Sequence, residues 1–187
     1  MDAEVLATVV RQARKRPLWV PGAATRAVAL GREAIERVLP HRDPFLFVDA
    51  IAAVDLDQAA LRGRRAIRPD DPVFAGHFPG QPIYPGVLQI ETMGQLGVCL
   101  AHFCRARAHD IAPDVVPAAV RAFKVHHALF QAEVLPGDDL TILARLLSAD
   151  DYTAICAGQL LKGGADGDAA APPTICALAV MEVYFVD

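Results

Sequence analysis

The sequence has no excess of basic residues, no long apolar run and no paired-cysteine motif. Its 18 Lys and Arg are outnumbered by 22 Asp and Glu, so the overall charge carries no signature of nucleic-acid binding. No run of 18 or more apolar residues occurs, which argues against a membrane-spanning helix. The four cysteines form no CxxC pair, and we interpret them as small buried side chains in a reducing compartment.

Common catalytic and metal-binding signatures are also missing. No G-x-S-x-G elbow, P-loop or dinucleotide glycine loop is found. His126 and His127 are adjacent in a predicted strand, so they should point to opposite faces and make a poor metal pair. The first basic cluster follows a short apolar stretch instead of preceding it, so we expect no secretory signal and a cytoplasmic location.

The length and the apolar content indicate one domain with an appendage. At 187 residues and 53% apolar content, the chain can bury a substantial core. Residues 1–30 are expected to be an N-terminal helical extension, with a helix over 2–16 whose basic end is solvated. Residues 31–187 form the main domain. A second helix is expected over residues 25–39.

The rest of the chain predicts an α+β fold. Residues 86–107 are apolar on every side, which is typical of a buried helix. Gly94 and Gly97 within it predict close approach of a sheet or a partner helix. The segments rich in β-formers are residues 45–55, 59–69, 119–135, 139–149, 152–162 and 174–186, with a flexible loop over 163–173. We therefore expect an antiparallel sheet wrapped around one long buried central helix.

Glu91 is a carboxylate within the apolar stretch of the predicted helix. Because burial disfavours the charged form of a carboxyl group, a buried Glu91 would be a proton donor near neutral pH. Gln95 lies four residues further along the same helical face and can hydrogen-bond it. The alternative is that Glu91 reaches solvent from the first turns of the helix or pairs with an arginine.

His77 is a lone imidazole in a rigid loop, because residues 76–86 hold six Gly or Pro in eleven positions. A neutral imidazole can act as a general base, although a loop His is more often an ordinary polar residue. Pro85 and Gly86 then open the helix, where free N–H groups can polarise a carbonyl oxygen. Such a base, acid and oxyanion site suit removal of a proton alpha to a carbonyl, with loss of water from the beta carbon. His41 is expected to have a structural role.

Three segments together resemble a known family. "LPHRDPFLFVDAI", "GHFPGQPIYPGVLQIETMGQ" and "VLPGDDL" are similar to the β-hydroxyacyl-acyl carrier protein dehydratases of the FabZ type, which are hotdog-fold enzymes of fatty acid synthesis. The match covers about residues 33–149.

The resemblance implies a role for each matching position. His77 would take the alpha proton, Glu91 would protonate the departing hydroxyl, and a backbone N–H of Gly86 or Val87 would hold the thioester oxygen. The implied supporting residues are Gly76, Phe78, Pro79 and Gln95, and the implied substrate-tunnel residues are Tyr84, Gln89 and Met93.

The resemblance also implies the partners. The acyl group would ride on the phosphopantetheine arm of an acyl carrier protein, and no metal or organic cofactor would be needed. Each site would lie at the interface of a homodimer, with His from one subunit and the acid from the other. In this family, dimers often join into trimers of dimers.

Several departures from the family pattern leave the substrate and pathway open. Tyr84 stands where Met or Phe is usual, and Gln89 where an aliphatic residue is usual. Gln131 and Ala132 replace two basic residues suited to an acidic carrier; the other cations considered for that role are Arg105, Arg107, Arg121 and Lys124. Fatty acid, polyketide and polyene pathways all stay open. A hotdog acyl thioesterase and a non-catalytic hotdog partner subunit are the alternatives.

Overall fold

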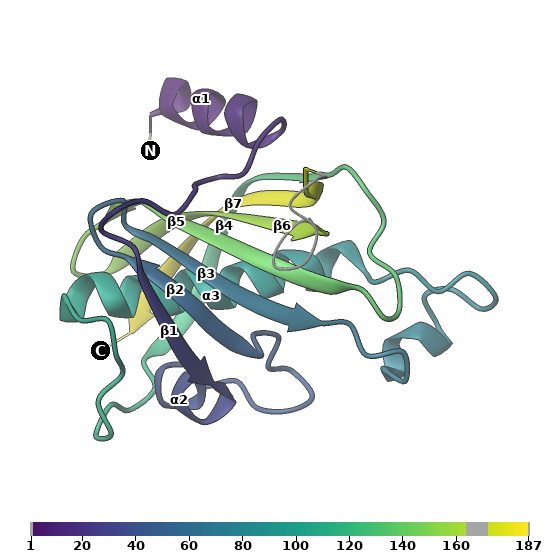
Figure 1. Ribbon diagram of the computed structural model, residues 1–187, viewed down its shortest axis with the longest axis horizontal. Helices are drawn as coiled ribbons and strands as arrows, with labels where there is room; N and C mark the ends of the chain where they lie inside the picture. Colours follow the sequence, from purple (N-terminus) through teal and green to yellow (C-terminus); the bar gives the residue numbers. More distant parts are fainter. Residues whose placement is uncertain (1, 164–171, 187) are drawn as a thin grey trace.

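The computed structural model describes residues 2–163 and 172–186, which form one curved antiparallel sheet around a long helix (Figure 1). The strand order across the sheet is β1-β2-β3-β5-β6-β7-β4. The strands are β1 (Arg26–Gly31), β2 (Ala50–Asp55), β3 (Ala60–Ala66), β4 (Ala119–Phe130), β5 (Asp139–Ala149), β6 (Thr153–Lys162) and β7 (Thr174–Val186). The α+β plan expected from the sequence is confirmed.

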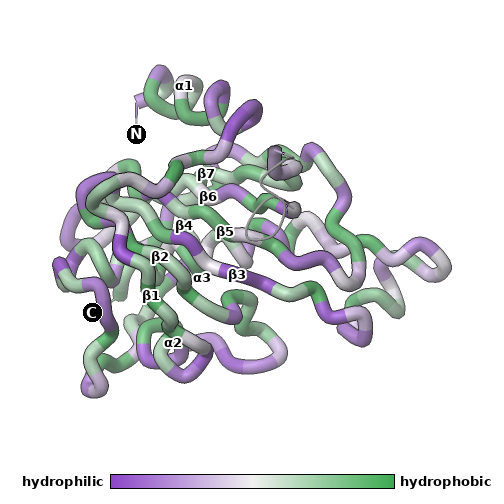
Figure 2. Tube along the Cα trace, in the orientation of Figure 1, coloured by the Kyte–Doolittle hydropathy of each residue, from purple (hydrophilic) through white to green (hydrophobic). Residues whose placement is uncertain are grey.

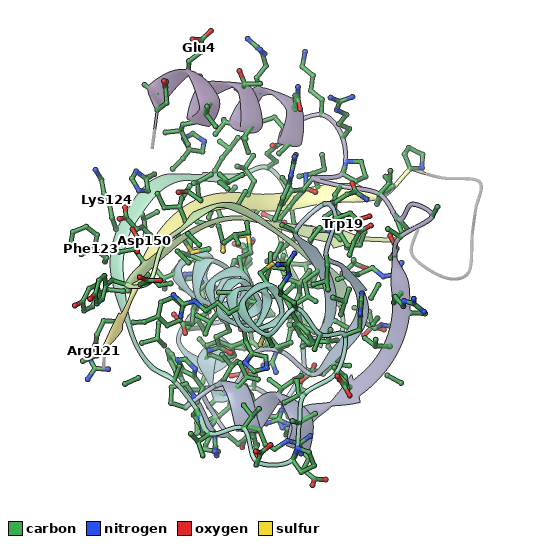
Figure 3. The ribbon with its side chains drawn as sticks, turned by 90° about the vertical axis from the view of Figure 1, so that its left-hand side faces the viewer. Glu4, Trp19, Arg121, Phe123, Lys124 and Asp150 are labelled. Carbon is green, nitrogen blue, oxygen red and sulfur yellow. The ribbon has the colours of Figure 1, made fainter. Side chains whose placement is uncertain are left out.

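Helix α3 (Gly86–Ala106) lies on the concave face of this sheet, and Figure 3 shows it nearly end-on beneath the arch of strands. Of its two central glycines, Gly97 allows the close approach that the sequence predicts, whereas a Cβ at Gly94 would make only an ordinary contact. A Cβ added at Gly97 would lie 3.1 Å from the Cβ of Cys156 on β6, and one at Gly94 would lie 3.5 Å from the Sδ of Met181 on β7. The helix is therefore packed directly against the central strands.

The helix expected over residues 25–39 is wrong in its first half. Residues 26–31 form β1, which pairs with β2 from Arg26 opposite Val54 to Gly31 opposite Ala50. Only α2 (Arg32–Val38) is helical. The apolar pattern before Arg32 is short, and the open edge of β2 offers hydrogen bonds that outweigh a weak local preference.

Of the strands that follow α3, β5, β6 and β7 are neighbours in the order of the sequence, whereas β4 is not beside β5. The turn at Pro136–Asp138, with Gly137 at a φ of 89°, connects β4 to β5 as predicted. However, β4 pairs with β7, from Ala119 opposite Val186 to Phe130 opposite Ala177. It therefore forms one edge of the sheet. The loop predicted over 163–173 lies largely outside the described residues.

Helix α1 (Ala3–Ala13) covers the opposite, convex face of the sheet (Figures 1 and 3). Its apolar side chains, including Leu6 and Val10, pack on Ile155 and Val180. Figure 2 shows green hydrophobic positions along this helix and a hydrophilic stretch at its C-terminal end. Within the described residues, no helix combines the length and apolarity needed to span a lipid bilayer.

Candidate active site

His77 is held by the loop between β3 and α3. A short 3-10 helix (Pro72–Ala75) precedes it, and the His77 N–H donates to the Val73 carbonyl at 3.0 Å. The ring Nδ1 lies 2.8 Å from the carbonyl oxygen of Ile83, and the ring stacks on Phe78 with centroids 4.0 Å apart. Because a carbonyl can only accept, Nδ1 carries the proton in the neutral ring and Nε2 keeps the basic lone pair.

Glu91 lies on the second turn of α3 and is held by two polar side chains. Gln95 Nε2 donates to Glu91 Oε1 at 2.9 Å, as the sequence predicts, and His41 Nε2 lies 3.4 Å from the same oxygen. The Glu91 side chain stays 33% exposed in the single chain, so its burial is incomplete. His41 was assigned only a structural role from the sequence, and the structure brings it to the carboxylate.

The two candidate catalytic groups line different cavities of the single chain. A cavity of about 550 Å³ contains His77, Tyr84, Gly86, Val87, Gln89 and Phe130 among its lining residues. Another, of about 250 Å³, contains His41, Phe45, Glu91 and Gln95 together with residues of β4 and β7. Ile90 borders both cavities. One chain alone therefore does not bring the imidazole and the carboxylate into one cavity.

The N-terminus of α3 supplies backbone donors to the His77 cavity. Pro85 is its N-cap residue, and Gly86 and Val87 both line the cavity. The first N–H groups of a helix have no acceptor within the helix, so they are available to a bound oxygen. A Cβ added at Gly86 would lie 2.8 Å from the ring of Phe130, so a larger residue there would displace this ring from the backbone.

The residues assigned to a substrate tunnel do not all reach the cavities. Tyr84 and Gln89 line the His77 cavity and are nearly fully buried, and Gln89 Nε2 donates to the Tyr84 carbonyl at 3.1 Å. Burial raises the pKa of the Tyr84 hydroxyl. Met93 is fully buried and packs against Gly158 of β6, so it belongs to the core between helix and sheet.

Other assigned loop residues flank the imidazole. Phe78 is half exposed, and Gly76 and Pro79 are exposed beside it. Phe78 contributes its ring face to His77, whereas the two smaller residues shape the loop backbone.

One ion-pairing contact at the border of the Glu91 cavity was not found from the sequence. His126 Nε2 lies 2.7 Å from Glu182 Oε2, and Glu182 lines the Glu91 cavity. His127 instead faces the hollow beneath α1, as expected for adjacent strand residues. No sequence signal joins positions 126 and 182, because their contact arises from the pairing of β4 with β7. Among the residues described, no three His, Cys, Asp or Glu side chains gather as a metal site would require.

The chain matches known proteins over the region that forms this site. The family model described as a FabA-like domain matches residues 39–166. The 3-hydroxyacyl-[acyl-carrier-protein] dehydratase FabZ of Xanthomonas campestris pv. campestris (strain B100) is 34% identical over 108 residues, which are 58% of this chain and 67% of the relative. The FabZ of Aliarcobacter butzleri (strain RM4018) is 39% identical over 107 residues, which are 57% and 69% of the two chains.

A solved structure gives the same fold. The dehydratase heterocomplex ApeI:P from Xenorhabdus doucetiae superposes with a TM-score of 0.57 at 17% identity, covering 82% of this chain and 91% of that one. The antiparallel sheet around α3 is thus the hotdog fold that the sequence predicts. Since the family model covers more than half of the residues, the chain belongs to the FabA-like family.

Proposed function

We propose that this chain is a dehydratase that removes water from a β-hydroxyacyl thioester on an acyl carrier protein to give the trans-2-enoyl thioester. The observation that carries the proposal is the orientation of His77. Its Nδ1 is bound to the Ile83 carbonyl, which leaves Nε2 as a base beside the N-terminus of α3. Membership of the FabA-like family and the FabZ relatives support the same reaction.

The proposed reaction uses two proton transfers. His77 Nε2 removes the alpha proton while an N–H of Gly86 or Val87 stabilises the negative charge on the thioester oxygen. The electron pair of the broken C–H bond forms the double bond, and the C–O bond at the beta carbon breaks. Glu91 gives its proton to the departing hydroxyl, which leaves as water. These side chains and backbone groups are sufficient for the chemistry, so we propose that no metal or organic cofactor takes part.

We further propose that a second copy of the chain completes the site. Strand β4 is an edge strand, and Phe123, Val125 and Phe130 on it are 70%, 51% and 48% exposed. Arg121, Phe123 and Lys124 project outward from this edge in Figure 3. Large apolar side chains along an open strand edge favour pairing with another strand.

Two-fold symmetry would join the two cavities. In an antiparallel pair of β4 strands, the Phe130 end of one strand lies beside the first half of the other. Phe130 lines the His77 cavity, whereas Val120 and Val125 line the Glu91 cavity. The pairing would therefore set the imidazole of one copy against the carboxylate of the other.

Mass spectrometry of a β-hydroxyacyl carrier protein tests the reaction. We expect the wild type to remove one water from the loaded carrier, and His77→Ala or Glu91→Gln to abolish the loss. Because dehydration is reversible, water addition to the enoyl carrier is measured in parallel. Release of free acid would indicate a thioesterase instead, and no reaction by a folded protein would favour a non-catalytic subunit.

Mixing the two inactive variants tests the shared site. If His77 and Glu91 come from different copies, a mixed dimer of His77→Ala and Glu91→Gln has one intact site. Random reassociation of equal amounts should then restore about a quarter of wild-type activity, since about half of the dimers are mixed and each has one of two sites. Unmixed variants are the control. Failure to regain activity when mixed dimers are demonstrated would refute the shared site.

A further inference from the structure

Helix α1 and strand β4 enclose a hollow on the convex face of the sheet, on the side opposite α3. Its volume is about 690 Å³. Its apolar lining comes from Ala3, Leu6, Ala7 and Val10 of α1, and its polar lining is Arg11, Arg14, Lys15, His127 and Gln131. Cationic side chains are thus concentrated on one side of a concave surface.

These cations have no anionic partner within the part of the chain that the structure describes. Arg11 contacts the Thr8 hydroxyl at 3.5 Å, and neither Arg14 nor Lys15 forms an ion pair with a carboxylate there. Glu4 is at the other end of the helix and points away from the sheet (Figure 3). The local field is therefore positive although the whole chain has a net charge of -4.

A histidine adds an unused polar atom to the same hollow. His127 Nε2 is buried and has no hydrogen-bond partner among the described residues. It lies on β4, across the hollow from the basic end of α1. A buried ring nitrogen without a partner costs stability, so its position favours a site where a bound group satisfies it.

The basic segment is fixed in position by a buried amide. Gln159 of β6 is fully buried on the convex face, and its Nε2 donates to the carbonyls of Ala13 and Arg16 at 2.6 and 3.0 Å. Its Oε1 accepts from the Leu18 N–H at 2.7 Å. Trp19 is also buried, and its Nε1 donates to the Leu61 carbonyl at 3.3 Å. Three backbone bonds to one buried side chain hold the end of α1 on the sheet.

The hollow adjoins the cavity that contains His77. Gln131 lines both of them, and its Nε2 donates to the Arg14 carbonyl at 3.1 Å. The basic side chains at the end of α1 are exposed, as the sequence predicts. The bond from Gln131 to the Arg14 carbonyl also brings this end of the helix to the position at which the chain lacks a basic residue of its own. In contrast, Arg105 bonds to the carbonyls of residues 150 and 151.

We propose that Arg11, Arg14 and Lys15 bind the acidic surface of the carrier protein around the phosphodiester of its acyl-bearing arm. The inference rests on the proposed function, because it concerns delivery of substrate to the same site. A phosphodiester that links the arm to a protein carries a negative charge whatever acyl group it bears. Cations in the adjoining hollow match that charge and steer the carrier toward the His77 cavity.

The test compares one acyl group on three supports. A β-hydroxyacyl group of medium length is offered on an acyl carrier protein, on coenzyme A and on N-acetylcysteamine, which lacks both protein and phosphate. The variant replaces all three cations, Arg11→Gln, Arg14→Gln and Lys15→Gln; the bond from Gln131 goes to the backbone carbonyl of residue 14, which these substitutions keep. The matched control is Arg26→Gln with Arg145→Gln, two exposed arginines on β1 and β5.

We expect the α1 variant to lower kcat/KM for the carrier substrate about 5- to 20-fold and to leave the N-acetylcysteamine substrate unchanged. The difference in kcat/KM between wild type and variant on the carrier substrate should shrink as the salt concentration is raised to about 0.5 M. The control variant should match the wild type on all three substrates. Coenzyme A, which has phosphate but no protein surface, should show a smaller loss than the carrier. An equal loss on coenzyme A and carrier, or no loss on the carrier, would overturn the proposal.

Binding separates this inference from the proposed function. The Kd of the carrier with an unloaded arm is measured for wild type and variant without any reaction, and we expect it to rise by a similar factor. Binding without dehydration would refute the proposed function and leave the docking surface standing. Absence of carrier binding by the folded wild type would overturn the docking surface itself.

Discussion

The amide of Gln95 connects the Glu91 carboxylate to the segment that precedes β2. Its Nε2 donates to Glu91 Oε1 at 2.9 Å and to the Phe45 carbonyl at 2.9 Å, and its Oε1 accepts from the Phe47 N–H at 2.7 Å. Gln95 is 1% exposed, so water cannot replace these bonds. It therefore fixes the position of the Glu91 carboxylate relative to this segment.

Replacement of Gln95 by leucine should lower catalytic activity by more than the accompanying loss of folding stability explains. We expect kcat to fall about 10- to 100-fold, because a small displacement of a reacting group is costly. Stability should fall by about 1–3 kcal/mol as buried backbone groups lose their partner. Steady-state kinetics and urea unfolding measure both. Thr92→Val is the control, since Thr92 is buried on the same helix and bonds to the Leu88 carbonyl. Similar kcat losses in both variants would contradict a positioning role.

Gly158→Ala should destabilise the packing between α3 and the sheet. A Cβ at Gly158 would lie 2.5 Å from the Cβ of Met93, and both atoms are fixed to backbone, so the helix must shift. We expect a loss of about 1–3 kcal/mol in the free energy of unfolding, measured with urea. Gly76→Ala is the matched control, because nothing lies within 4 Å of its added Cβ. An equal urea midpoint of unfolding for Gly158→Ala and Gly76→Ala would argue against the close contact between Gly158 and Met93.

The buried thiols should be nearly inert in the folded protein. Burial raises the pKa of Cys99 and that of Cys156 to about 12, from a usual value of 9.0. At pH 8 this leaves about 10³-fold less thiolate, and the thiolate is the reactive form. Iodoacetamide followed by peptide mass spectrometry should label the half-buried Cys104 before either of them. Labelling of Cys156 as fast as Cys104 would contradict this, and all four should react in denaturant.

Asp55 should make stability depend on pH in the acid range. Burial raises the pKa of its carboxyl, but hydrogen bonds from Thr25 and Gln58 outweigh burial and lower it overall. Because the folded pKa is below the unfolded one, the carboxylate stabilises the fold above about pH 4, and this contribution is lost as the pH falls through the folded pKa. Asp55→Asn should cost about 1–2 kcal/mol at pH 7. Urea unfolding between pH 7 and 3 should show the free energies of unfolding of the wild type and the variant converging as the pH falls. A difference that stays constant with pH would contradict this contribution of Asp55.

The central elements could be predicted because each has a strong local signal. Residues 86–106 are apolar on all sides and follow Pro85, which marks the start of a buried helix. The glycines and prolines around His77 exclude regular structure there. β1 was missed because its strand state depends on the free edge of β2, whose paired residues lie 19 to 28 positions further along the chain. The strand order was missed for the same reason, since β4 pairs with β7 across two intervening strands.

The site was predictable only where a residue conflicts with its surroundings. Glu91 in an apolar stretch and His77 in a rigid loop are such conflicts, and the pair Glu91–Gln95 follows from helical spacing. His41 and the basic end of α1 show no local conflict. Their positions come from tertiary packing, through the loop beside Gln95 and through the anchor Gln159.

The pairing of β4 with β7 also determines when the edge of the sheet can fold during synthesis of the chain. A growing chain completes β4 at Phe130, but the strand that it pairs with begins only at Thr174. Until residues 174–186 leave the ribosome, β4 has no partner strand among the described elements, and Phe130 has no fixed place against Gly86. The edge proposed to pair with a second copy is therefore the last part of the sheet to form, so two nascent chains would pair only after each has been synthesised through β7.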